Sequence, residues 1–567
     1  MSDIKIMALG GVRENGKNLY VVEVNDSIFV LDAGLKYPEN EQLGVDVVIP
    51  NLDYLIENKK RVQGIFLTHG HADAIGALPY IIAEVKAPVF GSPLTIELAK
   101  LFVKNSTAVK KFNNFHVIDS ETEIEFQDAV ISFFKTTHSI PESMGIVIGT
   151  KEGNIVYTGD FKFDQAARKY YQTDLARLAE IGRDGVLALL SDSANATSNE
   201  QVASEYEVGD EIKSVIEDAE GRVIVAAVAS NLIRIQQVFD AAAENGRRVV
   251  LTGFDIENIV RTAIRMKRIH IADENMIIKP KDMTRYEDNE LLILETGRMG
   301  EPINGLQKMA IGRHRYVQIK DGDLVFIVTT PSIAKEAVVA RVENLIYKAG
   351  GSVKLITQNL RVSGHANGRE LQLLMNLLKP KYLFPIQGEY RDLSAHAGLA
   401  QEVGMSADDI YIVKRGDIMV LEKDGFFHSG SVPAGDVMID GNAIGDVGNI
   451  VLRDRKVLSE DGIFIVVITV SKKEKKIISK ARVNTRGFVY VKKSRDILRE
   501  SAELVNTTVE DYLSKDTFDW GELKGKVRDE VSKFLFDQRN VAQQSFLWLW
   551  KFVDSVKRLP NFGSLSC

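Results

Sequence analysis

The sequence predicts a large α/β protein with more than one domain. Its 567 residues allow about two to four domains, and 45% hydrophobic with 26% charged residues is ordinary globular composition. Short apolar runs near the N-terminus are separated by turn signals such as Gly10-Gly11 and Asn25-Asp26, which predicts a β-rich beginning. From about residue 205 strands and helices alternate, which is typical of an inserted α/β domain.

Charge and cysteine content limit the class of protein. With a net charge of -7, nucleic-acid binding cannot be inferred from the overall field and would depend on local basic patches. The one cysteine, Cys567, excludes disulfide scaffolds and cysteine-based zinc sites, so any metal must be held by His, Asp and Glu. No signal-peptide pattern opens the chain and no stretch approaches the length of a membrane span, so we expect a cytoplasmic protein.

The strongest chemical signal is the stretch from Thr68 to Gly76, Thr-His-Gly-His-Ala-Asp-Ala-Ile-Gly. The apolar run Gly64 to Leu67 predicts a buried strand, which places His69, His71 and Asp73 on the loop where that strand ends. Two imidazoles two residues apart can converge on one metal ion, and the carboxylate suits a second, harder ion. The pattern indicates a metal-activated water, with two surface histidines by chance as the alternative.

Four further residues stand at predicted strand ends. His138 follows an apolar run and precedes a turn, as His69 does, and is the natural third nitrogen ligand. Asp160 and Asp192 each follow another apolar run. Asp32, in Leu-Asp-Ala-Gly, suits an acid that orients a ligand histidine, and a helix cap is an equally supported alternative.

Periodicity predicts the remaining elements. Strands are expected at Ile4–Leu9, Leu19–Val24, Ser27–Leu31, Val223–Val228, Val249–Leu251, Leu291–Leu294, Gly462–Val470 and Gly487–Val491. Helices are expected at Leu94–Val103, Ile233–Ala243, Ile256–Met266, Glu370–Leu378 and Arg495–Leu513. The segment Gly10 to Asn18 lacks the Gly-Lys-Ser/Thr ending of a phosphate loop, so we expect a structural turn there.

These motifs resemble a known family. The stretch around His69 resembles the His-x-His-x-Asp-His signature of metallo-β-lactamase-fold hydrolases, with Ala74 in place of the last histidine. The order of the other motifs resembles the β-CASP branch of that superfamily, which processes nucleic acids, and within it the ribonuclease J family. The matching stretches are Thr158–Asp164, Leu190–Ser193, Ala229–Asn231, Thr296-Gly297 with Gly300–Pro302, Val362–His365, Gly388–Tyr390, Gly445–Asp454 and Arg486–Tyr490. The resemblance runs from Ile4 to about Asp537.

The resemblance implies a metallo-β-lactamase αββα sandwich with an inserted β-CASP α/β domain and a small C-terminal α/β domain. The expected limits are 1–205 and 361–447 for the two parts of the metallo-β-lactamase domain, 206–360 for the β-CASP domain, 448–465 for a linker, 466–555 for the C-terminal domain and 556–567 for a tail. The Trp-containing segment Phe546–Val553 is too short to span a bilayer.

The C-terminal domain contains a local basic cluster. Its members are Lys472, Lys473, Lys475, Lys476, Lys480, Arg482 and Arg486. The cluster could follow RNA phosphates, although a solvated loop is the more frequent meaning of such a run.

The resemblance also implies one intact metal site and one degraded site. The intact site would consist of His69, His71, His138 and Asp160. The second would consist of Asp73, Ala74, the bridging Asp160 and Gln387. Ala74 offers no lone pair, and the amide oxygen of Gln387 is a weaker ligand than imidazole. We therefore expect one well-held zinc or manganese ion and a second that is weak or absent.

Other site residues are carried over from the family in the same way. His365 would donate a proton, with Asp192 as its acidic partner. The phosphate-binding loop would consist of Arg361, Val362, Ser363, Gly364 and His365, and Arg361 stands where relatives often carry histidine. Asp440 resembles a position that holds calcium together with carbonyls near Leu43 and Val45, with a plain turn aspartate as the alternative.

The resemblance implies a 5'-to-3' exoribonuclease of RNA processing and decay, and leaves endonuclease activity open. The substitutions at Ala74 and Gln387 resemble a weakly active paralogue of Gram-positive bacteria, which implies low activity and a complex with the active paralogue. Further implied partners are RNA, a second copy in a homodimer or tetramer and an RNA degradosome, with no membrane. The main alternative is a non-catalytic RNA-binding or scaffolding subunit. Two further hypotheses are a fully competent exonuclease and a small-molecule hydrolase, and the insertion argues against the latter.

Overall fold

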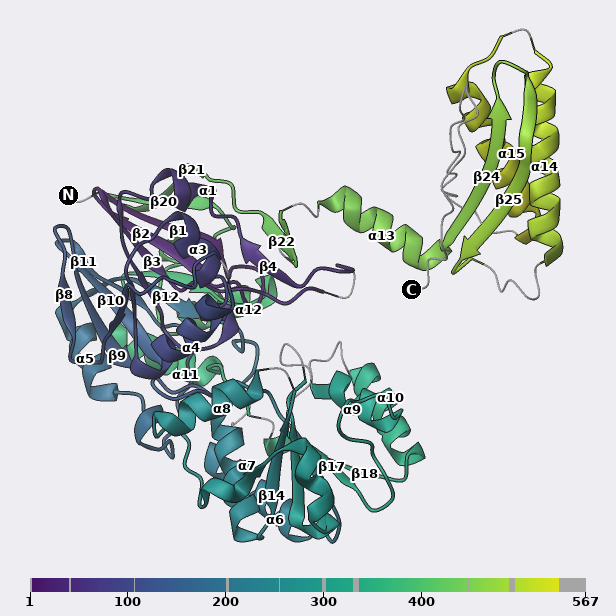
Figure 1. Cartoon of the computed structure of the whole chain (residues 1–567). Helices are drawn as coiled ribbons and strands as arrows, with labels where there is room; N and C mark the ends of the chain where they lie inside the picture. Colours follow the sequence, from purple (N-terminus) through teal and green to yellow (C-terminus); the bar gives the residue numbers. More distant parts are fainter. Residues whose placement is uncertain are drawn as a thin grey trace. The chain divides into compact units, whose positions relative to one another are not determined.

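The computed structural model describes residues 3–39, 42–106, 108–199, 203–253, 255–297, 302–329, 336–360, 362–441, 443–445, 448–488, 495–515 and 517–539 (Figure 1). The chain forms two compact units, which we describe separately. The first consists of residues 1–37 and 46–439, and the second of residues 38–45 and 440–567. Among the described helices, none combines the length and the apolar character needed to cross a membrane.

Two sheets form the centre of the first unit. The larger sheet has the strand order β21 (Gly425–Ser431), β20 (Asp417–Glu422), β1 (Ile4–Gly10), β2 (Leu19–Val24), β3 (Ser27–Leu31), β5 (Val62–Phe66), β6 (Val89–Gly91) and β7 (Phe115–Val117). The smaller has the order β19 (Tyr382–Ile386), β12 (Val186–Asp192), β11 (Gly153–Tyr157), β10 (Met144–Thr150), β9 (Val130–Lys135) and β8 (Glu123–Glu125). The Phe66 and Phe133 rings, one from each sheet, lie 6.4 Å apart between their centroids, so the two sheets pack face to face.

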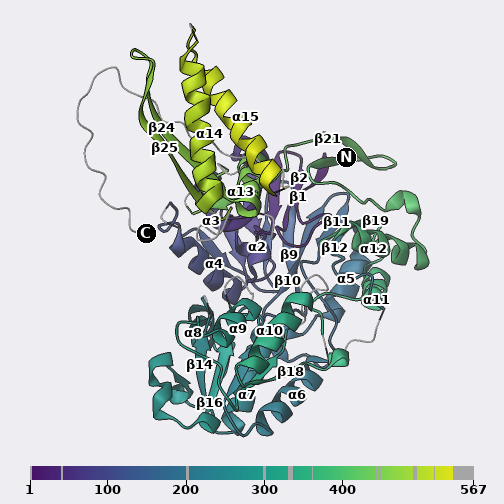
Figure 2. The same ribbon diagram turned by 90° about the vertical axis from the view of Figure 1, so that its right-hand side faces the viewer.

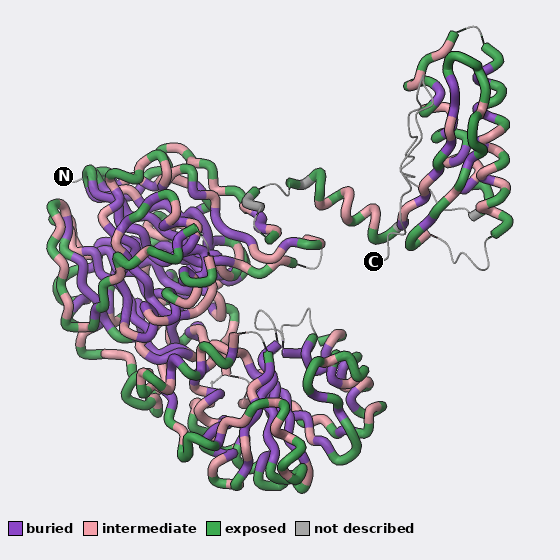
Figure 3. Tube along the Cα trace, viewed as in Figure 1, coloured by how far each residue is buried: buried purple, intermediate pink, exposed green. Residues whose placement is uncertain are grey.

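Helices cover the outer face of each sheet. Alternate residues of β1 and β2 enter two different cores, with Met7 and Val21 on the helix side and Ile6 and Val22 between the sheets. The larger sheet is covered by α3 (Leu78–Glu84) and α4 (Pro93–Asn105), and the smaller by α5 (Leu175–Asp184), α11 (Gly368–Leu378) and α12 (Tyr390–Glu402). This is the expected αββα sandwich, in which central strands such as β2, β3 and β12 are buried along their whole length, whereas the edge strands β7, β8 and β21 are largely exposed (Figure 3).

The inserted domain is a parallel sheet with helices on both faces (Figure 1). Its strand order is β15 (Ile277–Ile278), β14 (Arg248–Thr252), β16 (Leu291–Glu295), β13 (Val223–Ala226), β17 (Leu324–Ile327) and β18 (Ser352–Leu355). One face is covered by α6 (Glu205–Glu217), α7 (Leu232–Glu244) and α8 (Ile256–Arg265), and the other by α9 (Pro302–Ala310) and α10 (Glu336–Lys348). Burial on both faces explains why these strands are continuous apolar runs rather than alternating ones.

A buried ionic cluster joins the inserted domain to the sandwich. The ammonium of Lys162, in the sandwich, lies 2.8 Å from Oε1 of Glu205 at the start of α6, and Arg234 of α7 lies 3.0 Å from Oε2 of the same carboxylate. The three side chains are 3%, 12% and 5% exposed, so each charge depends on its partners for solvation. Lys162 follows Asp160 by two positions, so this cluster lies close in sequence to the predicted metal ligands.

The second unit is a two-layer α/β structure. Strands β24 (Ile463–Ser471) and β25 (Lys476–Arg486) pair antiparallel, and α14 (Arg495–Leu513) and α15 (Trp520–Arg539) pack on one face of the pair (Figure 2). Alternate residues of β24, such as Phe464 and Val466, enter the core with Val505 and Val527 of the helices. Helix α13 (Asn449–Asp461) precedes β24.

Most predicted elements are confirmed, and the exceptions lie in the second unit. The strands predicted at Leu19–Val24 and Ser27–Leu31 and the helix predicted at Arg495–Leu513 match the observed bounds. The strand predicted at Gly487–Val491 is wrong at its first two residues, which form a bend, and its other residues lie outside the described part. The missed partner of β24 is β25, which contains much of the basic cluster interpreted as a loop. The segment 448–465, expected as a linker, contains α13, and the Trp-containing segment lies outside the described residues.

Candidate metal and phosphate site

Three predicted ligand histidines meet at the carboxyl end of β5. His69 follows the strand, His71 is the N-cap residue of the short helix α2 (Ala72–Ile75), and His138 follows β9. Their ring centroids are 4.7 Å apart for His69 and His71, 4.9 Å for His69 and His138 and 4.8 Å for His71 and His138. The rings therefore occupy the corners of a nearly equilateral triangle, and their nitrogens form a group that could hold a metal ion.

Backbone carbonyls orient two of these rings. Nδ1 of His138 lies 2.8 Å from the carbonyl oxygen of Gly364, and Nε2 of His71 lies 3.2 Å from that of Ser230. Because a carbonyl only accepts, both of these nitrogens must carry the proton. The lone pairs then reside on His138 Nε2 and His71 Nδ1, which lie 3.1 Å apart. Two lone pairs that face each other at this distance repel, and a cation between them relieves the repulsion.

Asp32 orients the third ring through Thr68. The Thr68 hydroxyl donates to the Asp32 carboxylate, 2.8 Å away, and lies 2.9 Å from Nδ1 of His69, whose N–H it can accept. Asp32 also accepts from the Thr68 N–H and the Tyr157 hydroxyl, and it stands at the start of none of the described helices, so the capping alternative is wrong. Burial raises the pKa of Asp32 to about 6, against the lowering effect of His69. Nε2 of His69 is buried and has no hydrogen-bond partner among the described residues.

Carboxylates surround His69 on its other side. Nε2 lies 3.7 Å from Oδ1 of Asp73 and 3.8 Å from Oδ2 of Asp160. Burial lowers the pKa of His69, but Asp73 and Asp160 outweigh it and raise the pKa to about 9. Burial, reinforced by Asp73, raises the pKa of Asp160 well above its ordinary value. The site therefore places two carboxylates beside the His69 ring, and a metal ion could take the place of the proton that they favour on it.

His365 and Asp192 form a hydrogen-bonded pair beside the histidines. Nδ1 of His365 lies 2.7 Å from Oδ2 of Asp192, whose side chain is 1% exposed, and the rings of His365 and His138 are 5.8 Å apart. Burial lowers the pKa of His365, but Asp192 outweighs it and raises the pKa to about 10. The imidazole is therefore protonated at neutral pH, and Asp160 and Asp192 together with His365 form a further group of potential ligands.

The loop before His365 packs tightly against the site. A Cβ atom at Gly364 would lie 2.9 Å from Cε1 of His138, so the carbonyl that orients this ring requires a glycine. The Ser363 hydroxyl oxygen accepts from the N–H of His365 at 3.0 Å, and Val362 is half-buried. Arg361, predicted with these residues, lies outside the described part of the chain.

The two positions predicted to weaken the second metal site are both buried. Ala74 has no exposed surface and packs in the hydrophobic core. Gln387 is 4% exposed, with a left-handed φ of 49°, and its backbone bonds to Gly11 and Ser193. Its amide oxygen is buried and has no hydrogen-bond partner among the described residues. Gln387 therefore retains a free acceptor, whereas Ala74 contributes none.

The calcium site predicted at Asp440 does not fit the structure. The guanidinium of Arg455 lies 2.7 Å from Oδ2 of Asp440 and donates to the carbonyl oxygen of Leu43 at 2.8 Å. Calcium would need both of these oxygens as ligands, and the cationic side chain of Arg455 hydrogen-bonds to both. Asp440 therefore serves as the partner of an arginine, which the sequence did not indicate.

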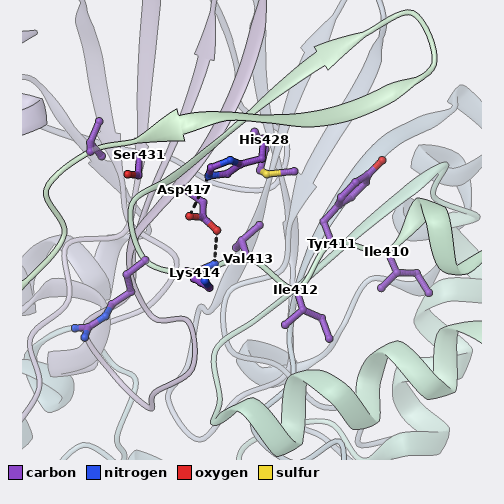
Figure 4. A pocket seen from close by; sticks show the side chains of 11 residues that line it. Ile410, Tyr411, Ile412, Val413, Lys414, Asp417, His428 and Ser431 are labelled. Atoms are coloured by element: carbon purple, nitrogen blue, oxygen red, sulfur yellow. Dashed lines mark hydrogen bonds and ion pairs between the residues drawn. The ribbon is translucent and has the colours of Figure 1, made fainter.

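A separate depression on the first unit has a volume of about 690 Å³ and contains none of the predicted site residues (Figure 4). Its polar lining includes Asp417 and His428, which are 3.3 Å apart, and Lys414. Arg415, also in the lining, is engaged by Asp436. Because this depression contains none of the potential metal ligands, we assign the candidate metal chemistry to the cluster of His69, His71 and His138.

Sequence reasoning missed the groups that orient the ligands. Thr68 stands inside the recognised motif and could have been noted as a neighbour of His69. Ser230 could not, because it lies 159 positions from His71 and acts through its backbone, for which sequence carries no signal.

Comparisons with known proteins agree with the observed domain composition. Family models match as the metallo-beta-lactamase superfamily (residues 12–190), the ribonuclease J beta-CASP domain (220–346), the Zn-dependent metallo-hydrolase RNA specificity domain (350–413) and the ribonuclease J C-terminal domain (450–541). A Streptococcus pyogenes protein named Ribonuclease J 2 is 80% identical over 95% of this chain and 97% of its own length. Ribonuclease J2 of Bacillus subtilis is 43% identical over 94% and 96%.

A solved structure shares the fold at low sequence identity. It is the crystal structure of a protein of unknown function from Enterococcus faecalis, which is 16% identical and covers 74% of this chain and 100% of its own. Its TM-score of 0.52 supports similarity of fold alone.

Proposed function

The chain belongs to the ribonuclease J family of metallo-β-lactamase-fold hydrolases, and we propose that it is a metal-dependent 5'-to-3' exoribonuclease of weak intrinsic activity that acts together with an active paralogue. One observation carries the catalytic part of this proposal. Ring nitrogens of His69, His71 and His138 converge beside the His365–Asp192 pair, so a potential metal site and a proton donor lie together.

Each residue of the site has a role in the proposed reaction. His69, His71 and His138, with Asp160, would hold a zinc or manganese ion. When bound, such an ion would lower the pKa of water enough to supply a nucleophile at neutral pH. His365, kept protonated by Asp192, would donate a proton to the leaving oxygen. The backbone of the loop from Val362 to Gly364 would bind the phosphate that is attacked.

The low activity follows from the second metal position. Asp73 and Asp160 remain, but Ala74 contributes no ligand, and Gln387 contributes a neutral amide oxygen. Two metal ions stabilise both the attacking and the leaving oxygen of a phosphodiester displacement, so a missing ion costs several kcal/mol, or orders of magnitude in rate.

RNA and a paralogous chain are the proposed partners. The match to the RNA specificity domain model supports RNA. Both relatives carry the number 2 in their names, which supports the existence of a paralogous chain. We propose that this protein forms a complex with that chain. We also propose that it self-associates as a dimer or tetramer and takes part in an RNA degradosome. We place the protein in the cytoplasm.

A second candidate is a non-catalytic RNA-binding subunit of the same assembly. The observation that favours it is the loss of ligands at Ala74 and Gln387, which could abolish rather than weaken catalysis.

Turnover of a 5'-monophosphorylated, end-labelled RNA distinguishes these candidates. The wild-type chain is compared with His69→Ala and with His270→Ala, which removes an exposed histidine as a matched control. We expect slow, metal-dependent release of mononucleotides by the wild type and by His270→Ala, and none by His69→Ala. If the wild type releases no more than His69→Ala, the chain is a non-catalytic subunit.

A further inference from the structure

Strand β25 presents a row of cations on one of its faces. Lys480, Arg482 and Arg486 are exposed, and Ala481 and Thr485, which lie between them in sequence, are buried in the second unit. Side chains of a strand alternate between faces, so the three cations point away from the core together. Asn484 lies between Arg482 and Arg486, and the pairing with β24 shifts register beside Lys480, so the three cations form an interrupted row.

These three cations are not neutralised within the described part of the chain. Neither β24 nor β25 contains an Asp or Glu, and no ion pair joins Lys480, Arg482 or Arg486 to another described residue. Other members of the basic cluster differ, because Lys476 pairs with Glu474 at 2.6 Å and Lys475 donates to the Lys515 carbonyl. Lys480, Arg482 and Arg486 therefore remain available to an external anion.

The face that carries them is not covered by the helices. Both α14 and α15 pack on the opposite face of the strand pair (Figure 2). On β24, Val467 lies opposite Arg482 and is 37% exposed, and Ile465 lies opposite Asn484. Among the described residues of the second unit, this face is therefore left uncovered by the helices and carries cations beside exposed apolar groups.

The charge of this segment contrasts with that of the whole chain. Residues 463–486 contain seven Lys or Arg and one Glu, in a chain whose net charge is -7. The overall field repels a polyanion, so binding of RNA requires a local reversal of sign such as this one.

We propose that Lys480, Arg482 and Arg486 form a second RNA-binding surface that contacts the phosphate backbone of single-stranded RNA. This surface rests on the proposed function, and it adds to the phosphate loop at Ser363 and Gly364. None of the exposed residues of β25 is aromatic, so stacking of bases on aromatic rings does not contribute to binding at this surface. Contacts confined to phosphates do not distinguish sequences, so this surface binds RNA without sequence preference.

The test is RNA binding by the full chain, measured by fluorescence anisotropy with single-stranded oligouridylate in EDTA across a salt series. The variant Lys480→Ala/Arg482→Ala/Arg486→Ala removes the surface. The control Lys524→Ala/Lys526→Ala/Lys533→Ala removes the same charge from helix α15 of the same unit. A third variant, Lys480→Arg/Arg482→Lys/Arg486→Lys, keeps the charge.

Three lost phosphate contacts should weaken binding by up to about 100-fold at 0.1 M salt and reduce the slope of log affinity against log salt by about 2. The control and the charge-keeping variant should bind as the wild type does. Equal losses in the control would mean that net charge alone is responsible, and would overturn the proposal.

Two other results would also overturn it, and they separate it from the proposed function. If the wild type binds RNA and the alanine variant binds equally well, the surface is not used and the proposed function stands. If the wild type binds no RNA in EDTA, this proposal fails, and the metal-dependent turnover of RNA still decides the proposed function. Light scattering on the same samples measures self-association. If the alanine variant loses both self-association and RNA binding, the face is an interface between copies of the chain, which would contradict the proposal.

Discussion

The Nδ1 atom of His365 lies 2.7 Å from Oδ2 of the buried Asp192, and this contact determines the charge of the histidine. Asp192 in turn accepts from the N–H of Ala194 at 2.9 Å, so its carboxylate is fixed in place. A protonated imidazole held this way is ready to donate to a leaving oxygen.

Asp192→Asn should lower the pKa of His365 from about 10 toward its ordinary 6.5, because the carboxylate is the largest influence that raises it. The measurement is an NMR titration of the His365 ring in metal-free protein. Glu121→Gln, which removes an exposed acid, should leave the value unchanged. A pKa that stays near 10 without Asp192 would contradict this account of the pair.

The carbonyl of Ser230 should contribute to metal affinity, because it fixes the tautomer of His71. Asn231 holds this turn, since its side chain accepts from the N–H of Arg234 and caps α7. We expect Asn231→Ala to weaken zinc binding by about 10-fold, measured by chelator competition. Asp174→Ala removes the equivalent cap of α5 and is the matched control. Equal affinities in both variants would show that the carbonyl does not orient His71.

Calcium should not change the melting temperature of the wild type by binding at Asp440. The Arg455 guanidinium already contacts both the Asp440 carboxylate and the Leu43 carbonyl oxygen. Removal of the guanidinium in Arg455→Ala frees both oxygens, and calcium should then raise the melting temperature. Arg455→Lys keeps a cation there and should not respond. A wild type stabilised by calcium, with the response lost in Asp440→Asn, would restore the calcium site.

Acid should destabilise the protein partly through His396. This side chain is buried against the Ser193 hydroxyl, and burial lowers its pKa to about 4 from an ordinary 6.5. Between these values the unfolded chain binds more protons than the folded one, so stability is full above about pH 6.5 and falls as the pH drops toward 4. The loss amounts to about 3 kcal/mol.

His396→Gln should remove this part of the acid destabilisation, because glutamine does not titrate. Urea unfolding of the wild type and the variant at pH 7 and pH 4.5 measures the difference between their slopes with pH. His116→Gln, at an exposed position, should retain the wild-type slope. Identical slopes for the wild type and His396→Gln would mean that His396 is not protonated on unfolding.

Local patterns in the sequence predicted where the candidate ligands lie. His69 and His71 follow β5 of the larger sheet, His138 and Asp160 follow β9 and β11 of the smaller sheet, and Asp192 ends β12, so strand ends of two packed sheets bring these residues together. An apolar run that predicts a strand is therefore enough to indicate where the candidate ligands at its end lie.

The errors arose where the pattern depends on distant contacts. Strand β25 is rich in Lys, Arg, Ser and Asn, residues that favour loops, and it is a strand because Ala481, Val483 and Thr485 pack toward α14 and α15. Arg455 reaches Leu43 across 412 positions, so nothing near Asp440 in the sequence identifies its partner.

Metal content by mass spectrometry, after dialysis against limiting zinc or manganese, tests most directly whether one of two metal positions is lost. We predict one tightly bound ion per wild-type chain, none in His69→Ala and a second ion in the variant Ala74→His/Gln387→His, with faster cleavage of 5'-monophosphorylated RNA. Two tightly bound ions in the wild type, or no gain in the double variant that folds and binds its first ion, would contradict it.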